Sequence, residues 1–306
     1  MTGIRRDTIM RLMLRVGESC VRFLDNRIRR IRSRHVQVDE IWTYVFKKRA
    51  HIIGDECLAG IGDQYVFVGM DADTKLVISH LIGKRDATSA YYFMRDLQER
   101  LTGRTQLTTD GFRPYINAVE DTFGADVDYA QLVKIYGQAQ ASGDSRDWYA
   151  PVRVIDAVPF TVMGMPKLYA ISTSFIERQN LTIRMQMRRF TRLTNGFSKK
   201  LENLKAAVAL HFAHYNFCRV HTTLRVTPAM QAGLADHVWT ILDSSGAPAV
   251  GHLASPRVGG RVIHYKHIES RVEETRHSLE TFIQFPRAVS RTNHYRTGRR
   301  EHAGIV

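Results

Sequence analysis

The order of strand-like and helix-like segments between residues 36 and 190 constrains the fold of this chain most. Short runs of alternating apolar residues indicate strands, whereas apolar residues that recur every three or four positions indicate helices. The order β-β-β-α-β-α-β-α predicts an α/β fold, in which helices flank a mixed five-stranded sheet. The predicted strands are residues 36–46, 64–70, 76–83, 105–109 and 127–135. The predicted helices are residues 86–102, with Asp86 as the cap, 111–123 and 174–190.

The segments outside this order give weaker signals. Residues 2–34 predict two arginine-rich helices, and Gly17 is expected to end or kink the first of them. Several glycines and prolines in residues 136–173 predict a long irregular loop, of the kind that is usually functional or mobile. Ser198 is expected to cap another helix, and from residue 236 onward the sequence predicts a poorly structured basic tail.

The charge of the chain indicates a polyanionic partner. Its 306 residues include 44 lysines and arginines against 30 acidic residues, so the net charge is +14. Such an excess is typical of proteins that bind nucleic acid. There is no apolar run of about 18 residues and no signal-peptide core, so we expect no membrane partner and a cytoplasmic location. The three cysteines are far apart, which argues against a zinc ribbon or a disulfide framework.

Three acidic residues lie where a sheet of this kind can bring them together. Asp39 is on the first predicted strand, Asp110 directly follows the fourth, and Glu177 is near the start of the helix after the long loop. Two-metal phosphoryl transfer needs carboxylates that converge on hard cations such as Mg²⁺. Spacing alone is weak evidence, because a chain of this size offers many such triplets. Glu40 is a weaker candidate than Asp39, since neighbours on a strand point to opposite faces.

The helix predicted over residues 174–190 has two interpretations. Ser174 and Glu177 match a capping box, and Glu177 and Arg184 are spaced by two helical turns, which places them on one face. The helix is therefore either an amphipathic surface helix with solvated arginines, or an element that supplies a metal ligand and holds a polyanion.

Several motifs resemble the DDE transposases of bacterial insertion sequences, most closely the IS1 family. The matching motifs are residues 38–42, 109–111, 175–180, 187–192, 214–221 and 227–230. This resemblance covers about residues 1–235. It implies an RNase H-like fold in which Asp39, Asp110 and Glu177 are the catalytic, metal-binding residues. It also implies Mg²⁺ or Mn²⁺, two ions in all, as the cofactor for 3′-end cleavage and strand transfer of an insertion sequence.

The resemblance also implies a domain organisation and partners. Residues 1–34 are expected to be the helical remnant of a helix-turn-helix DNA-binding head, residues 35–235 the RNase H-like catalytic domain, and residues 236–306 the basic tail. The expected partner is double-stranded DNA, both the element's ends and the target. We also expect a homo-oligomer on that DNA, associated with the bacterial nucleoid. The candidate DNA contacts are Lys47, Lys48, Arg184, Arg188, Arg189, Arg192, Lys199 and Lys200.

Two other functions remain open at this point. Members of the family usually carry an upstream zinc-binding segment and a complete helix-turn-helix, and this chain is expected to start too late to hold either. That departure motivates the alternative of a truncated, inactive DNA-binding remnant that interferes with a full-length transposase. A third hypothesis, an RNase H-type nuclease acting on RNA–DNA hybrids, needs the same carboxylates. For His211, His214 and His221, packing or DNA contact is favoured over a metal site, because a fourth ligand is missing.

Overall fold

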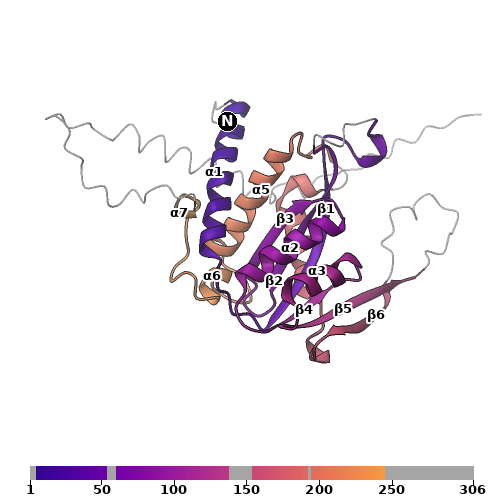
Figure 1. The fold of residues 1–306 in the computed structure, drawn as a ribbon. Coiled ribbons are helices and arrows are strands. Elements are labelled where there is room, and N and C mark those ends of the chain that lie inside the picture. The colour runs from indigo at the N-terminus through magenta and orange to yellow at the C-terminus, as the bar shows by residue number, and fades with distance from the viewer. Residues whose placement is uncertain (1–4, 54–59, 138–153, 192–193, 245–306) are drawn as a thin grey trace, which may run out of the picture. The chain divides into compact units, whose positions relative to one another are not determined.

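A mixed sheet of six strands forms the centre of the protein, with the strand order β3-β2-β1-β4-β5-β6 (Figure 1). β1 pairs in parallel with β4 and β4 with β5, whereas the other neighbouring strands are antiparallel. The computed structural model describes residues 5–53, 60–137, 154–191 and 194–244. The strands are β1 His35–Val45, β2 Gly62–Asp71, β3 Val77–Gly83, β4 Thr105–Thr109, β5 Val127–Tyr136 and β6 Val154–Met163.

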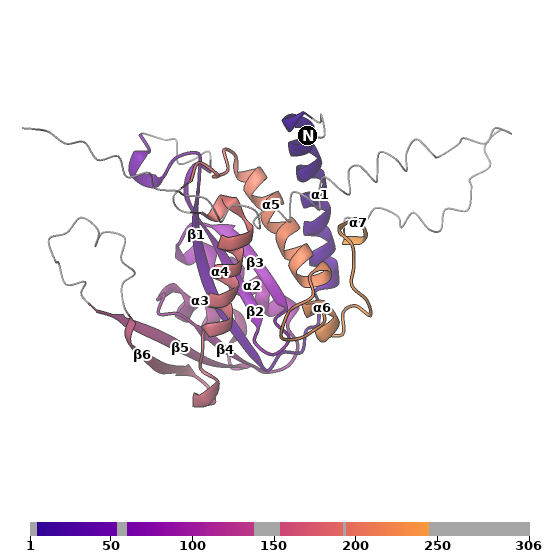
Figure 2. The same cartoon turned by 180° about the vertical axis from the view of Figure 1, so that it is seen from behind.

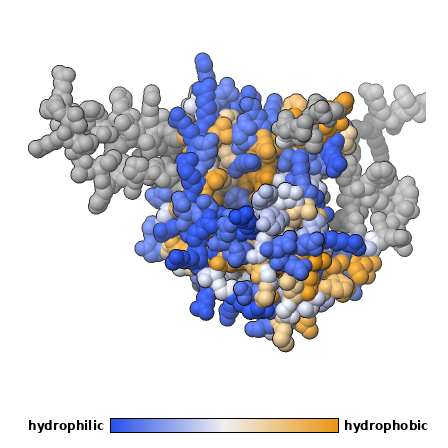
Figure 3. All heavy atoms as spheres, in the orientation of Figure 1, coloured by the Kyte–Doolittle hydropathy of each residue, from blue (hydrophilic) through white to orange (hydrophobic). Residues whose placement is uncertain are grey.

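The sixth strand corrects the prediction of a five-stranded sheet, because β6 lies in the region that was expected to be an irregular loop. β6 is an edge strand, and most of its residues are exposed. Buried and exposed residues therefore do not alternate along it, and its sequence lacks the pattern that predicts a strand. It also contains Pro159, which lacks a backbone N–H and is tolerated at a sheet edge. Hydrophobic side chains gather on the surface over the β5–β6 part of the molecule (Figure 3). Residues 138–153 of the predicted loop lie outside the described residues.

Helices cover both faces of the sheet. α2 (Ala87–Arg100) and α3 (Pro114–Phe123) cover one face, and α4 (Ser174–Gln186) lies on the opposite face with α5 (Leu201–Ala213) beside it (Figures 1 and 2). The predicted cap of α2 is confirmed, since the Asp86 side chain accepts a hydrogen bond from the Ser89 N–H. The shorter helical turns are η1 Arg49–His51, η4 Leu168–Ala170, η5 Arg188–Phe190, η6 His214–Cys218, α6 Pro228–Gln231 and α7 Ile241–Ser244. No described helix is long and apolar enough to cross a membrane.

The N-terminal region forms one continuous helix, α1 (Arg6–Arg27), rather than the two predicted helices. Gly17 neither ends nor kinks it. A Cβ atom at Gly17 would lie 2.5 Å from the Cβ of Ala206, so this glycine allows α1 and α5 to pack closely. Within the predicted tail, Trp239 packs its ring against Phe23 of α1, with 5.2 Å between the ring centroids. Residues 245–306 lie outside the described residues, so the tail prediction for them is untested.

The side chains at the end of α5 and in the turn after it are mostly buried and pack within the protein. The ring of His211 lies 5.4 Å from that of Phe212, and burial lowers the pKa of His211 to about 3, so its ring is neutral. Asn216 is fully buried and pairs with the backbone of Val77 on the edge strand β3, donating to its carbonyl at 2.9 Å and accepting from its N–H at 3.0 Å. These contacts agree with packing as the role of His211, and Asn216 ties this turn to β3.

Ser198 does not cap α5. The helix begins at Leu201 after Lys200, and the Ser198 side chain is buried with no hydrogen-bond partner for its hydroxyl among the described residues. Its backbone carbonyl instead accepts a hydrogen bond from Phe46 at 2.9 Å, which fastens this segment to the end of β1. A tertiary contact thus replaces the local cap that the sequence predicted.

Candidate active site

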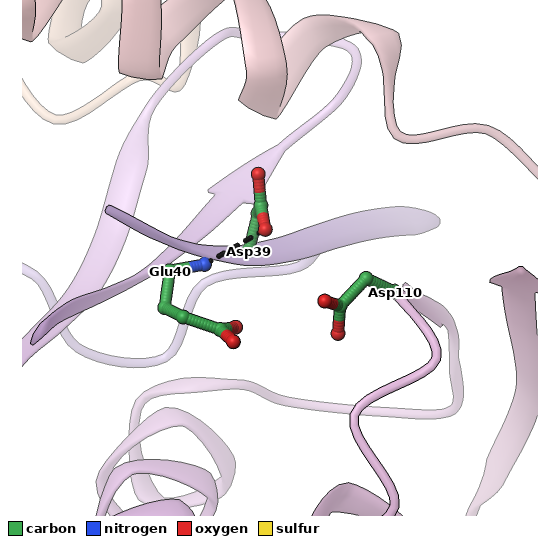
Figure 4. A group of neighbouring side chains, drawn as sticks. All are labelled: Asp39, Glu40 and Asp110. Carbon is green, nitrogen blue, oxygen red and sulfur yellow. Dashed lines mark hydrogen bonds between the residues drawn. The ribbon is translucent and has the colours of Figure 1, made fainter. Parts of the chain in front are cut away.

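Three carboxylates meet where β1 runs past the end of β4 (Figure 4). Asp39, Glu40 and Asp110 each offer an oxygen, and these oxygens lie within 4.8 Å of one another. The strand register explains the meeting of the two aspartates. Gln37 of β1 is paired in parallel with Thr108 of β4, and Asp39 and Asp110 each lie two residues further along. The sequence predicted that Asp39 and Asp110 would converge, and their positions agree with that prediction.

Glu40 was predicted to be a weaker candidate than Asp39, but it belongs to the cluster. Asp39 and Glu40 do leave the strand in different directions, yet the Glu40 carboxylate still belongs to the cluster (Figure 4). β4 ends at Thr109, so a longer side chain can reach Asp110 beyond that end. The Glu40 side chain is only 4% exposed, and the Tyr115 hydroxyl donates to its Oε2 at 3.0 Å. The adjacent acidic pair in the sequence was the available signal.

Both oxygens of Asp39 are held in place. Its own neighbour Glu40 donates a backbone N–H to Oδ1 at 2.9 Å, and Asn180 of α4 donates its Nδ2 to Oδ2 at 2.8 Å. Burial, together with the negative charges of Glu40 and Asp110, raises the pKa of Asp39 to about 7. The charged form of Asp39 is therefore costly without a cation nearby.

Asp110 begins the turn that follows β4. Its Oδ1 accepts the Phe112 N–H at 3.1 Å, which is a local aspartate turn. Just before it, the buried Thr109 hydroxyl donates to the Asp110 carbonyl at 2.8 Å and also contacts the Tyr129 hydroxyl on β5 at 2.9 Å. Burial raises the pKa of Asp110, while the Phe112 hydrogen bond and the charges of nearby basic residues oppose that rise.

Glu177 lies in the first turn of α4, as predicted, but Ser174 and Glu177 do not form the predicted capping box. The helix begins at Ser174 with Thr173 as its N-cap residue, and the Thr173 hydroxyl donates to Glu177 Oε1. The ammonium group of Lys134 on β5 pairs with the same oxygen. Glu177 is 39% exposed and is not one of the three acids that lie within 4.8 Å of one another.

A cavity of about 650 Å³ is lined by Asp39 and Asp110 of the acidic cluster and by Glu177. Arginine and lysine side chains line it as well. Among them, Arg85 pairs with Glu40, lies 3.5 Å from Asp110 and stacks 4.2 Å from the centre of the Phe112 ring. The charged lining residues are Asp39, Asp110, Glu177, Arg85, Arg113 and Lys134. A cavity with both signs of charge can hold an anionic ligand together with a hard cation.

The donor set fits a divalent cation. Mg²⁺ and Mn²⁺ prefer carboxylate oxygens, and the cluster offers three within one small volume. Asn180 supports this fit, because it is 8% exposed and its Oδ1 has no hydrogen-bond partner among the described residues, while its Nδ2 holds Asp39. A buried amide oxygen beside a carboxylate is a group that a metal-bound water can satisfy.

The candidate DNA contacts fall into different environments. Arg189 is half-buried, donates to the sulfur of Met13 on α1 at 3.3 Å, and has its pKa lowered by burial, so it faces the protein rather than solvent. Arg192 lies outside the described residues. The exposed members of the set are Lys48, Arg188, Lys199 and Lys200, and the half-buried members are Lys47 and Arg184.

Comparisons with known proteins leave the family open. No protein-family model matches the chain, and no curated protein matches it either. One solved structure that it resembles is the cryo-EM structure of the piggyBac transposase synaptic complex with hairpin DNA. The TM-score is 0.32 at 10% sequence identity, over 78% of this chain and 56% of that one. The chain thus spans little more than half of that transposase, and at this TM-score the likeness carries no argument. The resemblance to the IS1 family stays a prediction.

Proposed function

We propose that this chain is a metal-dependent DNA transposase of the DDE class, similar to the IS1 family and built on an RNase H-like sheet. One observation carries the proposal: Asp39, Asp110 and Glu177, which are distant in the sequence, line the same cavity. Three acids of a dispersed triplet would rarely share a cavity by chance. The matching motifs named above contain these same three residues, which supports the proposal independently of the geometry.

The chain's own residues have separate roles in this proposal. Asp39 and Asp110, with Glu40 beside them, supply the carboxylate oxygens for Mg²⁺ or Mn²⁺. Asn180 orients Asp39 through its hydrogen bond to Oδ2, so Asp39 keeps one geometry as a ligand. Bound divalent ions would polarise the phosphodiester, activate the attacking oxygen and stabilise the leaving oxygen. Arg85 and Arg113 line the same cavity, and guanidinium groups can pair with phosphate oxygens.

Two successive phosphoryl transfers follow from this site. In the first, a water oxygen bonds to the phosphorus at the element's end, and the P–O bond to the 3′-oxygen breaks, which leaves a free 3′-hydroxyl. In the second, that hydroxyl attacks a target phosphodiester and displaces the target's own 3′-oxygen. Each step forms one P–O bond and breaks one, and no covalent link to the protein is required.

The partner in this proposal is double-stranded DNA, bound by a homo-oligomer. The net charge of +14 supports DNA, and the exposed basic residues Lys48, Arg188 and Lys199 are the candidate phosphate contacts. Helix α1 would belong to a DNA-binding head, although its apolar face is used to pack on α5. The remnant hypothesis differs from the main one in a single measurable respect, since a remnant binds DNA but never joins it.

Asp110→Asn tests the proposal. The substitution keeps the size of the side chain and removes one carboxylate, so we expect 3′-end cleavage and strand transfer to fall by about 10³-fold or more. DNA binding in a gel-shift assay should be unchanged, because the loss concerns a metal ligand. The substrates would be duplexes of the sequences that flank the gene, supplied with Mn²⁺ or Mg²⁺, either intact or with a free 3′-hydroxyl.

Asp121→Asn is the matched control, because Asp121 is exposed on α3, outside the cavity, and the charge change is the same. It should retain full joining activity. If wild type binds DNA but neither cleaves nor joins it with either metal, the remnant hypothesis replaces this one. Cleavage of RNA–DNA hybrids in preference to duplex DNA would instead favour an RNase H-type nuclease.

A further inference from the structure

Four acids lie in or beside the cavity, and each of them other than Asp39 is paired with a basic side chain of the protein itself. Arg85 contacts Glu40 and Asp110, and Lys134 pairs with Glu177. When ionised, the four carboxylates carry two more charges than these two paired cations, and Arg113 is a third basic residue in the lining of the cavity. A second divalent ion would have to compete with a protein cation for its ligands.

Lys134 is placed so that a ligand can displace it from Glu177. It comes from β5, next to the cavity, and its side chain is 25% exposed, so solvent and ligands can reach it. Its positive charge also reaches Asp110, where it opposes the rise in the pKa of that carboxyl. Lys134 thus acts electrostatically on Glu177 and Asp110, two of the three members of the proposed triad. The Thr173 hydroxyl would keep a hydrogen bond to Glu177 after Lys134 had left.

From this arrangement we infer that Lys134 is a positioning residue that holds Glu177 away from the metal ligands until a DNA phosphate enters the cavity. The inference rests on the proposed function. An entering phosphodiester offers the ammonium group a charged oxygen partner, so Lys134 exchanges Glu177 for the phosphate. The released Glu177 can then turn toward Asp39 and Asp110. The complete set of ligands would form only when DNA is present, which limits unproductive hydrolysis.

Lysine suits this role better than arginine would. Its ammonium group is a compact charge on a flexible stem and forms single contacts, whereas arginine forms a planar two-pronged pair with a carboxylate. Arg85, which is held by Glu40 and stacks on Phe112, is the more rigidly placed cation of the two. The cavity therefore combines one fixed cation with one that can exchange partners.

Titration with Mn²⁺, followed by isothermal calorimetry and by the electron paramagnetic resonance of free Mn²⁺, tests the inference on the full chain. Wild type without DNA should bind one ion tightly, and adding a short DNA duplex should introduce a second. In Lys134→Gln the second ion should bind without DNA, at least about tenfold more tightly than in wild type. Lys134→Arg, which keeps the charge and pairs more firmly with Glu177, should still need DNA for the second ion.

Lys205→Gln is the matched control, because Lys205 is exposed on α5, does not line this cavity and loses the same charge. It should behave as wild type. Melting temperatures of each variant, measured before titration, exclude misfolding, and Lys134→Met supplies a second neutral variant. Equal second-ion affinity in wild type and both neutral variants would overturn the inference and leave the proposed function intact. If wild type binds no Mn²⁺ with or without DNA, both are overturned.

Discussion

Two partly buried groups of charges in this protein are organised in opposite ways. At the junction of α1 and α2, Arg100 donates to Asp25 and Asp96 and to the backbone carbonyls of Leu24 and Ile28, so its guanidinium is fully paired. In the cavity at the end of β4, by contrast, three carboxylates crowd within 4.8 Å of one another. The first group joins elements of the fold, whereas in the second the carboxylates outnumber the single arginine, Arg85, that contacts them.

The pKa values of the two groups reflect this difference. Burial would raise the pKa of Asp96, but hydrogen bonds from Arg100 and Ser79 outweigh it and lower that pKa. Burial also raises the pKa of Asp39, and there the neighbouring acids raise it further, to about 7. Charge that is satisfied from within the protein stabilises it, whereas unsatisfied charge needs a ligand from outside. The charge of Asp39 in the acidic cavity therefore lowers the stability of the free protein and favours the binding of a cation.

Arg100→Gln should have the largest effect on stability. The side chain is 10% exposed, and its loss would remove the cationic partner of Asp96 and Asp25 and one donor from each of two buried carbonyls. Removing one partner of a fully buried ion pair costs about 3–5 kcal/mol, and because the two acids are partly exposed we expect a smaller loss of about 2–3 kcal/mol from denaturant unfolding. Arg95→Gln on the same helix is the control, because Arg95 is 57% exposed and its pair with Glu99 should contribute at most about 0.5 kcal/mol. Equal losses would remove the distinction between the two groups of charges.

Asp39→Asn should change stability with the opposite sign. The pKa of about 7 for Asp39 in the folded state lies above the usual pKa of an aspartate, 3.8, so the favourable contribution of Asp39 is present at low pH and is lost as pH rises to about 7. At pH 8 in EDTA the variant should melt about 2–4 °C above wild type, a gain on the order of 1 kcal/mol. At pH 4 the gain should vanish.

Added Mg²⁺ sharpens this second test. It should raise the melting temperature of wild type, because a ligand that binds only the folded state stabilises it, and should raise that of Asp39→Asn less. Asp121→Asn, which is outside the cavity, should follow wild type at both pH values. A variant that is less stable than wild type at pH 8 without metal would show that Asp39 is structurally satisfied rather than strained.

The sequence predicted local features better than contacts between distant segments. The strand over residues 105–109 and the Asp86 cap were correct, because both depend on nearby residues. The exposed edge strand β6 was missed, since it buries no alternating face. Gly17 was taken as a helix end, because only the position of Ala206 shows why a glycine is needed there.

The candidate site follows the same rule. Asp39 and Asp110 could be predicted to meet, because Asp110 follows the end of β4, where α/β folds gather ligands, and Asp39 lies on another strand of the same sheet. The part played by Glu40 depends on where its neighbouring strand stops, and the pairing of Glu177 with Lys134 depends on β5 lying close to α4. The pairing of Glu177 with Lys134 joins residues that are distant in the sequence, so no local pattern could have revealed it, whereas the only local signal for Glu40 was its place next to Asp39.

The smallest expected effects are those of substituting Arg188 and Arg189, which differ in their environment. They are adjacent in the sequence and were predicted to contact DNA equally, but Arg188 is exposed whereas Arg189 packs against Met13. If Arg188 neutralises one phosphate, the negative slope of log affinity against log salt should become shallower by about 0.9 in Arg188→Gln. The melting temperature should be unchanged. Arg189→Gln should lower the melting temperature and leave the slope unchanged. Fluorescence anisotropy at several salt concentrations measures the slope. A slope change for Arg189→Gln alone would mean that Arg189 turns outward to bind DNA, and that the contact with Met13 belongs only to the free protein.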